Sequence, residues 1–155
     1  MQIKEGLTYD DILLVPQFSS LVSRKDVDLS VDLGKGVKLS MPIVSANMSD
    51  VTECRMARKI AELGGLAIIH RFNTPGEQLT QFFLATAFRK YLQNVGCAVG
   101  VQYDDRERVD FLVGNGCRII CVDVAHSHHE KTGEFVKWVS ETYPDVLLIA
   151  GNVAT

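Results

Sequence analysis

The 155-residue sequence contains no apolar run of the roughly 20 residues that a transmembrane helix needs. Its amino terminus, MQIKEGLTYDD, also lacks the basic and then apolar order of a secretory signal. Neither sign of charge is in large excess, because 16 basic and 19 acidic residues leave a net charge of −3. Nucleic acids and anionic membranes therefore have no electrostatic reason to bind. We expect one cytoplasmic domain with small-molecule ligands.

Several common site motifs are also missing. No CxxC spacing occurs among the cysteines, which we expect to be small buried hydrophobes: Cys54, Cys97, Cys117 and Cys121. The histidines of HSHH lack the i, i+4 spacing of a helical zinc pair, so we predict no metal site. A GxSxG elbow is absent, and SANMSDVT, after the first predicted strand, has no glycine to cradle a phosphate.

Short apolar runs alternate with segments of helical spacing from residue 42 onward. The pattern predicts strands starting near residues 42, 66, 97, 118 and 146, and helices over 52–63, 75–92, 104–114 and 130–142. A spacing of about 20 to 30 residues per unit is typical of the (β/α)8 TIM barrel. We therefore predict an α/β fold with about five of eight barrel units. An open doubly wound sheet is the alternative, although it usually carries a Gly-rich first turn.

Residues 1–41 differ from the barrel residues 42–155. Val27, Leu29, Val31 and Leu33 alternate with other residues, GKG follows, and VKLS resumes the alternation. This pattern predicts a short antiparallel hairpin ahead of the barrel. We interpret residues 1–155 as a single partial barrel domain with this amino-terminal segment.

Polar side chains gather just past the predicted strand ends, at Ser45, Asn47, Ser49, His70, Arg71, Gln102, Asp104, Asp123, His126, His128, His129, Asn152 and Thr155. Carboxyl ends of barrel strands meet at one mouth, where active sites lie. Asp50, Thr52 and Asp104 could instead cap the helices that follow them. Asp123 ends an apolar strand, where an unpaired carboxylate is costly. We therefore expect Asp123 to be paired or to bind a ligand.

Seven ordered blocks carry a resemblance that spans nearly the whole chain: LTYDDILLVPQFS, SRKDVDLS, MPIVSANM, GGLAIIHRF, AVGV, VDVAHSH and IAGNVAT. Together they closely resemble the IMP dehydrogenase/GMP reductase family. The resemblance implies a (β/α)8 barrel that transfers hydride between a purine nucleotide, GMP or IMP, and NAD or NADP. It also implies a catalytic cysteine that bonds to C2 of the purine. A homo-tetramer and a monovalent cation such as K⁺, with ligands outside these residues, would complete the enzyme.

The resemblance implies that the SANM block contributes to the nucleotide site. Ser45 and Met48 would line it, with the thioether of Met48 lying on the purine base. The alternative is that Met48 only fills the barrel mouth, in which case it should be sealed among Ile43, Ile68 and Val99. A site residue should instead be accessible and share a pocket with Asp123 and Asn152.

The cofactor side is implied by the last two blocks. Asp123 of VDVAH would contact the nicotinamide riboside, with Ala125 and His126 near the cofactor channel. Asn152 of AGNV would stand close to the reacting centre. A carboxylate accepts hydrogen bonds from ribose hydroxyls, and an amide offers both a donor and an acceptor.

The family's catalytic loop, Gly-Ser-x-Cys-Thr, does not occur in residues 1–155, so none of the four cysteines inherits the role of nucleophile. We expect this segment to be inactive alone and the remaining strands to come from a second chain or a longer parent. The other possibility is a non-catalytic truncated barrel that acts as an assembly or partner-binding module.

Two features bear on the choice within the family. Residues 71–97 hold only one predicted helix, which leaves no room for a CBS-type regulatory insert. SANM and IIHRF favour a GMP reductase, whereas LTYDDILLVP and the VTE after SANMSD favour an IMP dehydrogenase. We slightly prefer the reductase.

Overall fold

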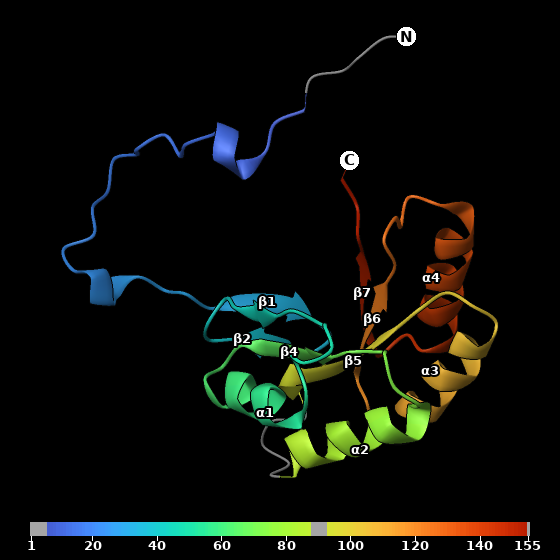
Figure 1. The fold of residues 1–155 in the computed structure, drawn as a ribbon. Helices are drawn as coiled ribbons and strands as arrows, with labels where there is room; N and C mark the ends of the chain where they lie inside the picture. The colour runs from blue at the N-terminus through green and yellow to red at the C-terminus, as the bar shows by residue number, and fades with distance from the viewer. Residues whose placement is uncertain (1–5, 88–92, 155) are drawn as a thin grey trace, which may run out of the picture.

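The computed structural model describes residues 6–87 and 93–154, which form two sheets (Figure 1). Five parallel strands follow one another in sequence order in the larger sheet: β3 (Val44–Ser45), β4 (Leu66–Ile69), β5 (Val95–Val99), β6 (Ile119–Asp123) and β7 (Leu147–Gly151). The connecting helices are α1 (Cys54–Glu62), α2 (Pro75–Thr86), α3 (Asp104–Gly114) and α4 (Glu130–Thr142). Residues 88–92 of the predicted second helix lie outside the described residues.

The helices cover one face of the larger sheet. All four contribute to a cluster that packs on this face, with Ala57, Phe82, Leu112 and Val139 against Ile69, Val99 and Val122. The other face packs on the hairpin through Leu66, Ile68, Ile119, Val37 and Leu39. A doubly wound sheet would carry helices on both faces. The curled sheet with helices outside is therefore five units of a TIM barrel, as predicted.

The hairpin confirms the second part of the fold prediction with one correction. β1 (Val31–Gly34) pairs antiparallel with β2 (Val37–Leu39) across a turn at Lys35 and Gly36, both of which have positive φ. The predicted strand began at Val27, which was wrong. The carboxylate of Asp28 accepts a hydrogen bond from the Ser30 backbone N–H at 2.9 Å, and this local turn delays the strand.

Helix caps differ from the sequence interpretation at three residues. α1 has Glu53 rather than Asp50 or Thr52 at its N-cap, because the Thr52 hydroxyl instead donates to the Ala46 carbonyl at 2.6 Å. α3 has Tyr103 at its N-cap, so Asp104 lies inside the helix. α2 follows its sequence signals: Thr74 and Glu77 form a reciprocal capping box and proline occupies the first turn.

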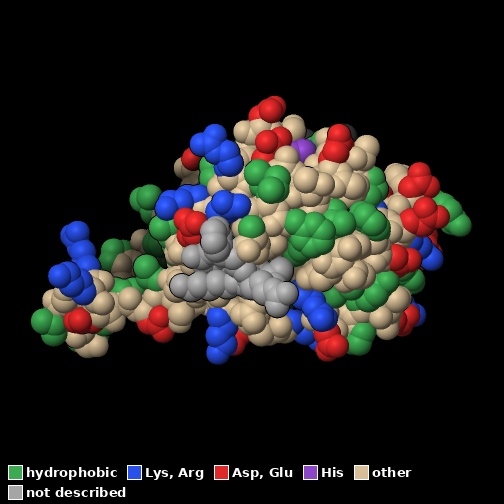
Figure 2. Space-filling view, turned by 90° about the horizontal axis from the view of Figure 1, so that it is seen from below, with side chains coloured by type: hydrophobic (Ala, Val, Ile, Leu, Met, Phe, Trp, Pro, Cys, Tyr) green, Lys and Arg blue, Asp and Glu red, His purple; other side chains and the backbone are tan. Residues whose placement is uncertain are grey.

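Residues 6–30, here called the arm, run away from the body of the molecule (Figure 1). Short 3₁₀ turns at Tyr9–Asp11 and Arg24–Asp26 are each closed by a capping box. Large apolar side chains of the arm are exposed, including Leu13 at 95% and Phe18 at 96%. Figure 2 shows the arm projecting from a rounded body. None of the helices in the described ranges is long and apolar enough to cross a membrane.

Candidate functional site at the carboxyl ends of the strands

The carboxyl ends of β3 to β7 lie along one edge of the sheet, because all five strands are parallel. The polar residues noted in the sequence follow these ends. Ser45 closes β3, His70 and Arg71 follow β4, Asp123 closes β6, and Asn152 follows β7. Sites of barrel proteins lie at this edge, since loops from several strands converge there.

Asp123 is paired, as its position at the end of an apolar strand predicts. The Nε of Arg71 lies 3.8 Å from the Oδ2 of Asp123 and donates a hydrogen bond to the Asp123 backbone carbonyl at 3.1 Å. The Asp123 side chain is 24% exposed, so part of it still faces solvent. An anchored but accessible carboxylate can accept hydrogen bonds from a ligand.

Backbone hydrogen bonds join the loop after β6 to the end of β7. The Val124 N–H donates to Gly151 O at 2.9 Å, and the Asn152 N–H donates to Val124 O at 2.7 Å. The Ser127 N–H donates to Asn152 O at 2.9 Å. This ladder brings Asn152 next to the segment that holds Asp123, Ala125 and His126, so the structure groups the four residues predicted for the cofactor side.

Two strands, β4 and β5, separate Asp123 in β6 from Ser45 in β3 and from Met48 just after it. Met48 is 58% exposed and is therefore not sealed among Ile43, Ile68 and Val99. The Ser45 hydroxyl is buried and has no hydrogen-bond partner within the described chain. Of five cavities in the described part of the chain, none joins Met48 to Asp123 and Asn152. Their placement in one pocket remains a prediction.

A buried polar network that the sequence does not reveal supports the strand ends from the helix side. Gln78 of α2 is fully buried, and its amide nitrogen lies within hydrogen-bonding distance of the carbonyls of Ile69, His70 and Ala98 at 2.7 to 3.3 Å. Its amide oxygen accepts from Arg108 of α3 at 3.0 Å. One side chain thereby ties together the ends of β4 and β5. The only local signal is a glutamine beside Leu79 on an apolar helix.

The same network fixes the loop after β5. The Asp105 carboxylate accepts hydrogen bonds from the backbone N–H groups of Gly100 at 3.1 Å and Gln102 at 2.8 Å. Arg108 lies 4.0 Å from this carboxylate and donates to the Asn73 carbonyl at 2.9 Å. Burial lowers the pKa of the Arg108 guanidinium from its usual value, while Asp105 opposes the shift.

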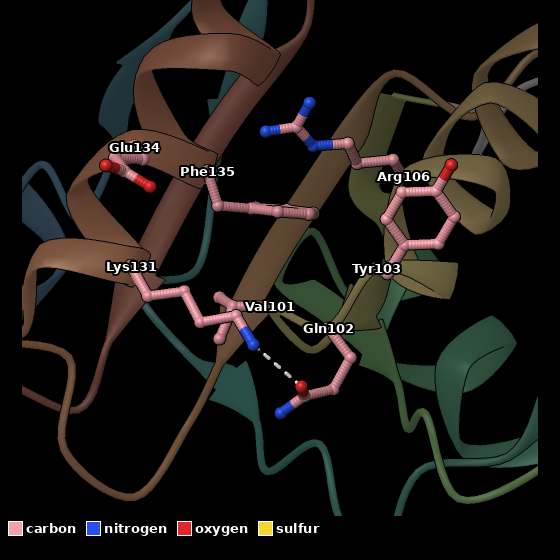
Figure 3. Close-up of a pocket in the computed structure, with 7 residues that line it drawn as sticks. All are labelled: Val101, Gln102, Tyr103, Arg106, Lys131, Glu134 and Phe135. Carbon is pink, nitrogen blue, oxygen red and sulfur yellow. Dashed lines mark hydrogen bonds between the residues drawn. The ribbon is translucent and has the colours of Figure 1, made fainter.

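A cavity of about 300 Å³ opens beside this loop, between α3 and the first turns of α4 (Figure 3). Its lining comprises Val101, Gln102, Tyr103, Arg106, Lys131, Glu134 and Phe135. The ammonium of Lys131 donates to the side-chain oxygen of Gln102 at 2.7 Å, the contact drawn in Figure 3. Gln102 also lines a second cavity together with Asp104, so the structure places both polar residues predicted at the end of β5 in cavities.

Two of the four cysteines are core residues, and the other two, Cys54 and Cys121, are partly buried against the core. Cys97 and Cys117 are fully buried, and Cys117 raises the pKa of the Cys97 thiol well above its usual value, as does burial. Burial, with a smaller contribution from Asp123, raises the pKa of Cys121 to about 11. Protonated thiols are poor nucleophiles. The raised pKa values therefore keep Cys97 and Cys121 as protonated thiols.

Comparison with known proteins places these features in a family context. The IMP dehydrogenase / GMP reductase domain matches residues 6–155. An inosine-5'-monophosphate dehydrogenase of Borreliella burgdorferi is 33% identical over 199 aligned positions, which cover 98% of this chain and 49% of the relative. A GMP reductase of Chromobacterium violaceum is 33% identical over 159 positions, covering 99% and 47%.

A third relative matches more closely over a shorter stretch. An inosine-5'-monophosphate dehydrogenase of Nitrosopumilus maritimus is 49% identical over 81 positions, which cover 52% of this chain and 17% of the relative. The chain spans about half the length of the relatives that it matches from end to end.

Proposed function

This chain belongs to the IMP dehydrogenase/GMP reductase family, and we propose that it forms the first five strands of a purine nucleotide oxidoreductase barrel. The observation that carries the proposal is the carboxyl edge of the sheet. There the motif residues at the ends of β3, β6 and β7 stand on strands in the order of a TIM barrel, over a fixed polar network. We call residues 1–155 together with the remaining barrel strands the complete enzyme.

The residues present fit a nicotinamide cofactor. The Asp123 carboxylate is anchored by Arg71 and still 24% exposed, so it can accept hydrogen bonds from ribose hydroxyls. Ala125, His126 and Asn152 are exposed beside it and would line the cofactor side. When bound, the nicotinamide ring supplies or accepts the hydride. The chain's own residues then bind and orient, which accelerates a reaction by holding the reacting groups in place.

The nucleotide side rests on the SANM block. Ser45 carries a buried hydroxyl without a partner in the described chain, which can bond to a ligand, and the exposed Met48 thioether can lie against a flat purine ring. Such a sulfur–aromatic contact contributes about 0.3 to 1.5 kcal/mol. GMP and IMP are the purine nucleotides that the family resemblance implies.

We propose GMP reduction with NADPH over IMP oxidation with NAD. SANM and IIHRF support this preference. The alignment with the Chromobacterium reductase is 159 positions long, close to the 155 residues of this chain. The alignment with the Borreliella dehydrogenase is 199 positions long, so that dehydrogenase contains residues that have no counterpart in this chain. The 49% identity with the Nitrosopumilus dehydrogenase over 81 positions supports the alternative.

A direct assay tests the proposal. The complete enzyme should consume NADPH when GMP is added and should reduce NAD with IMP more slowly. If the enzyme reduces NAD with IMP but does not oxidise NADPH with GMP, the protein is a dehydrogenase. A folded protein that catalyses neither reaction would rule out the proposed function altogether.

A further inference from the structure

Arg71 follows β4, yet its guanidinium reaches the end of β6. β5 lies between these strands in the sheet, so the side chain spans the end of a whole strand. At its far end, Nε donates to the Asp123 carbonyl at 3.1 Å and lies 3.8 Å from the Asp123 carboxylate. Two separate atoms of Asp123, in its backbone and its side chain, therefore face the same guanidinium.

Gly100, just past the end of β5, lies beside this path. A Cβ at Gly100 would lie 2.5 Å from the Oδ2 of Asp105, which is shorter than real Cβ contacts, and 3.4 Å from the Nη1 of Arg71, which is an ordinary contact distance. A side chain at Gly100 would therefore displace the Asp105 carboxylate, while the Arg71 guanidinium passes within contact distance of this backbone position.

The near end of Arg71 is also anchored. The guanidinium of Arg108 donates to the Asn73 carbonyl at 2.9 Å and approaches the Arg71 carbonyl at 3.5 Å. At the far end, the Arg71 guanidinium carbon also lies 5.1 Å from the centre of the Phe72 ring, within the range of a cation–π contact. Contacts at both ends restrict the side chain, so it can transmit a fixed position to Asp123.

We propose that Arg71 is a positioning residue that holds the Asp123 carboxylate in the orientation required to bind the ribose of the cofactor. This proposal rests on the proposed function. The guanidinium contacts both the backbone carbonyl and the carboxylate of Asp123 and so removes rotational freedom before the cofactor arrives. A residue acting in this way changes cofactor binding without changing the fold or the purine nucleotide site.

The first test uses Arg71→Gln and Arg71→Lys in the complete enzyme. Arg71→Gln should raise the KM for the cofactor about 10-fold, the scale of one charge-assisted hydrogen bond, and leave the KM for the purine nucleotide unchanged. Arg71→Lys keeps the positive charge and a donor and should recover most of the affinity, although it lacks the planar fork. Arg118→Gln, an exposed arginine at the amino end of β6, is the matched control and should match wild type.

A double-mutant cycle then tests whether Arg71 acts through Asp123. If it does, Arg71→Gln adds little to the cofactor KM of Asp123→Ala, because the group it positions is already gone. Additive effects, or an Arg71→Gln enzyme with the cofactor KM of wild type, would overturn the proposal while leaving the enzyme's function intact. A wild-type complete enzyme with neither reductase nor dehydrogenase activity would instead overturn the proposed function, and this proposal with it.

Discussion

The arm and the sheet with its covering helices contain similar apolar side chains in opposite environments. Phe18 in the arm is 96% exposed, whereas Phe82 of α2 is fully buried against the sheet. Electrostatics differ in the same way: local hydrogen bonds from Thr8 lower the pKa of Asp11 in the arm, while burial raises that of Cys121 in β6. The arm is organised by contacts a few residues apart, and the sheet by contacts between distant elements.

This difference indicates which region of the chain contributes to the stability of the fold. The helix-covered face of the sheet is closed by α1 to α4, so its apolar residues need no further partner. The arm exposes its apolar residues to solvent along its length. Stability of residues 1–155 should therefore depend on the sheet and its helices and hardly at all on the arm.

The largest expected effect comes from the same substitution made in both regions. Phe82→Ala should lower the free energy of unfolding by about 3 to 5 kcal/mol, because it leaves a cavity in a closed core. Phe18→Ala should change it by less than about 0.5 kcal/mol, as is usual for exposed sites. Urea denaturation of the two variants makes the comparison. Equal losses would show that the arm packs on the body.

A second pair of substitutions sharpens the contrast within the sheet and its helices. Gly96→Ala in β5 would place a Cβ 2.7 Å from the Ile119 side chain and 2.8 Å from its carbonyl, and should cost about 1 to 3 kcal/mol of stability. Gly133→Ala in α4 meets no atom within 4 Å and should add about 0.5 to 1 kcal/mol, since alanine favours a helix. Thermal unfolding should show shifts of opposite sign, and a stabilised Gly96→Ala protein would contradict the strand packing.

A third expected effect is on stability at alkaline pH. Cys121 titrates at about 11 in the folded chain against an ordinary value of 9.0, so its stabilising contribution is complete below pH 9 and is lost as pH rises toward 11. Cys121→Ser should therefore lose stability less steeply over pH 9 to 11. Tyr143, with a pKa raised to about 12 by burial and by Asp110, leaves a residual slope of the same sign. The midpoints of urea denaturation of wild type and Cys121→Ser across this pH range measure the difference. If the two proteins lose stability equally with pH, Cys121 is exposed to solvent rather than buried.

The sequence predicted most of this fold because its strongest signals are local. Helices 104–114 and 130–142 were placed at their observed ends, where Gly116 and Pro144 follow shortly after. β5 starts at Val95, two residues before the prediction, since Gly96 looks like a breaker but packs against Ile119. Close approach between strands is a tertiary property, and periodicity in one strand does not report it.

The candidate site also contains features that the sequence predicts and features that it does not. Polar residues at strand ends, such as Asp123 and Asn152, could be predicted because parallel strands bring their ends to one edge. The contacts of Gln78, Arg108 and Asp105 could not, because they join residues of α2 and α3 to each other and to backbone groups of β4, β5 and the loops after them. The sequence predicts that Asp123 is paired or binds a ligand. It does not identify Arg71 as the partner, because that contact depends on a side chain that crosses the end of β5.

The most direct test of the account is turnover of GMP with NADPH by residues 1–155 alone and by a fusion of these residues to the carboxyl-terminal half of the Chromobacterium violaceum GMP reductase. The account predicts no NADPH consumption by residues 1–155, which contain no Gly-Ser-x-Cys-Thr loop, and GMP-dependent consumption by the fusion. Turnover by residues 1–155 alone, or a folded fusion without activity, would contradict it.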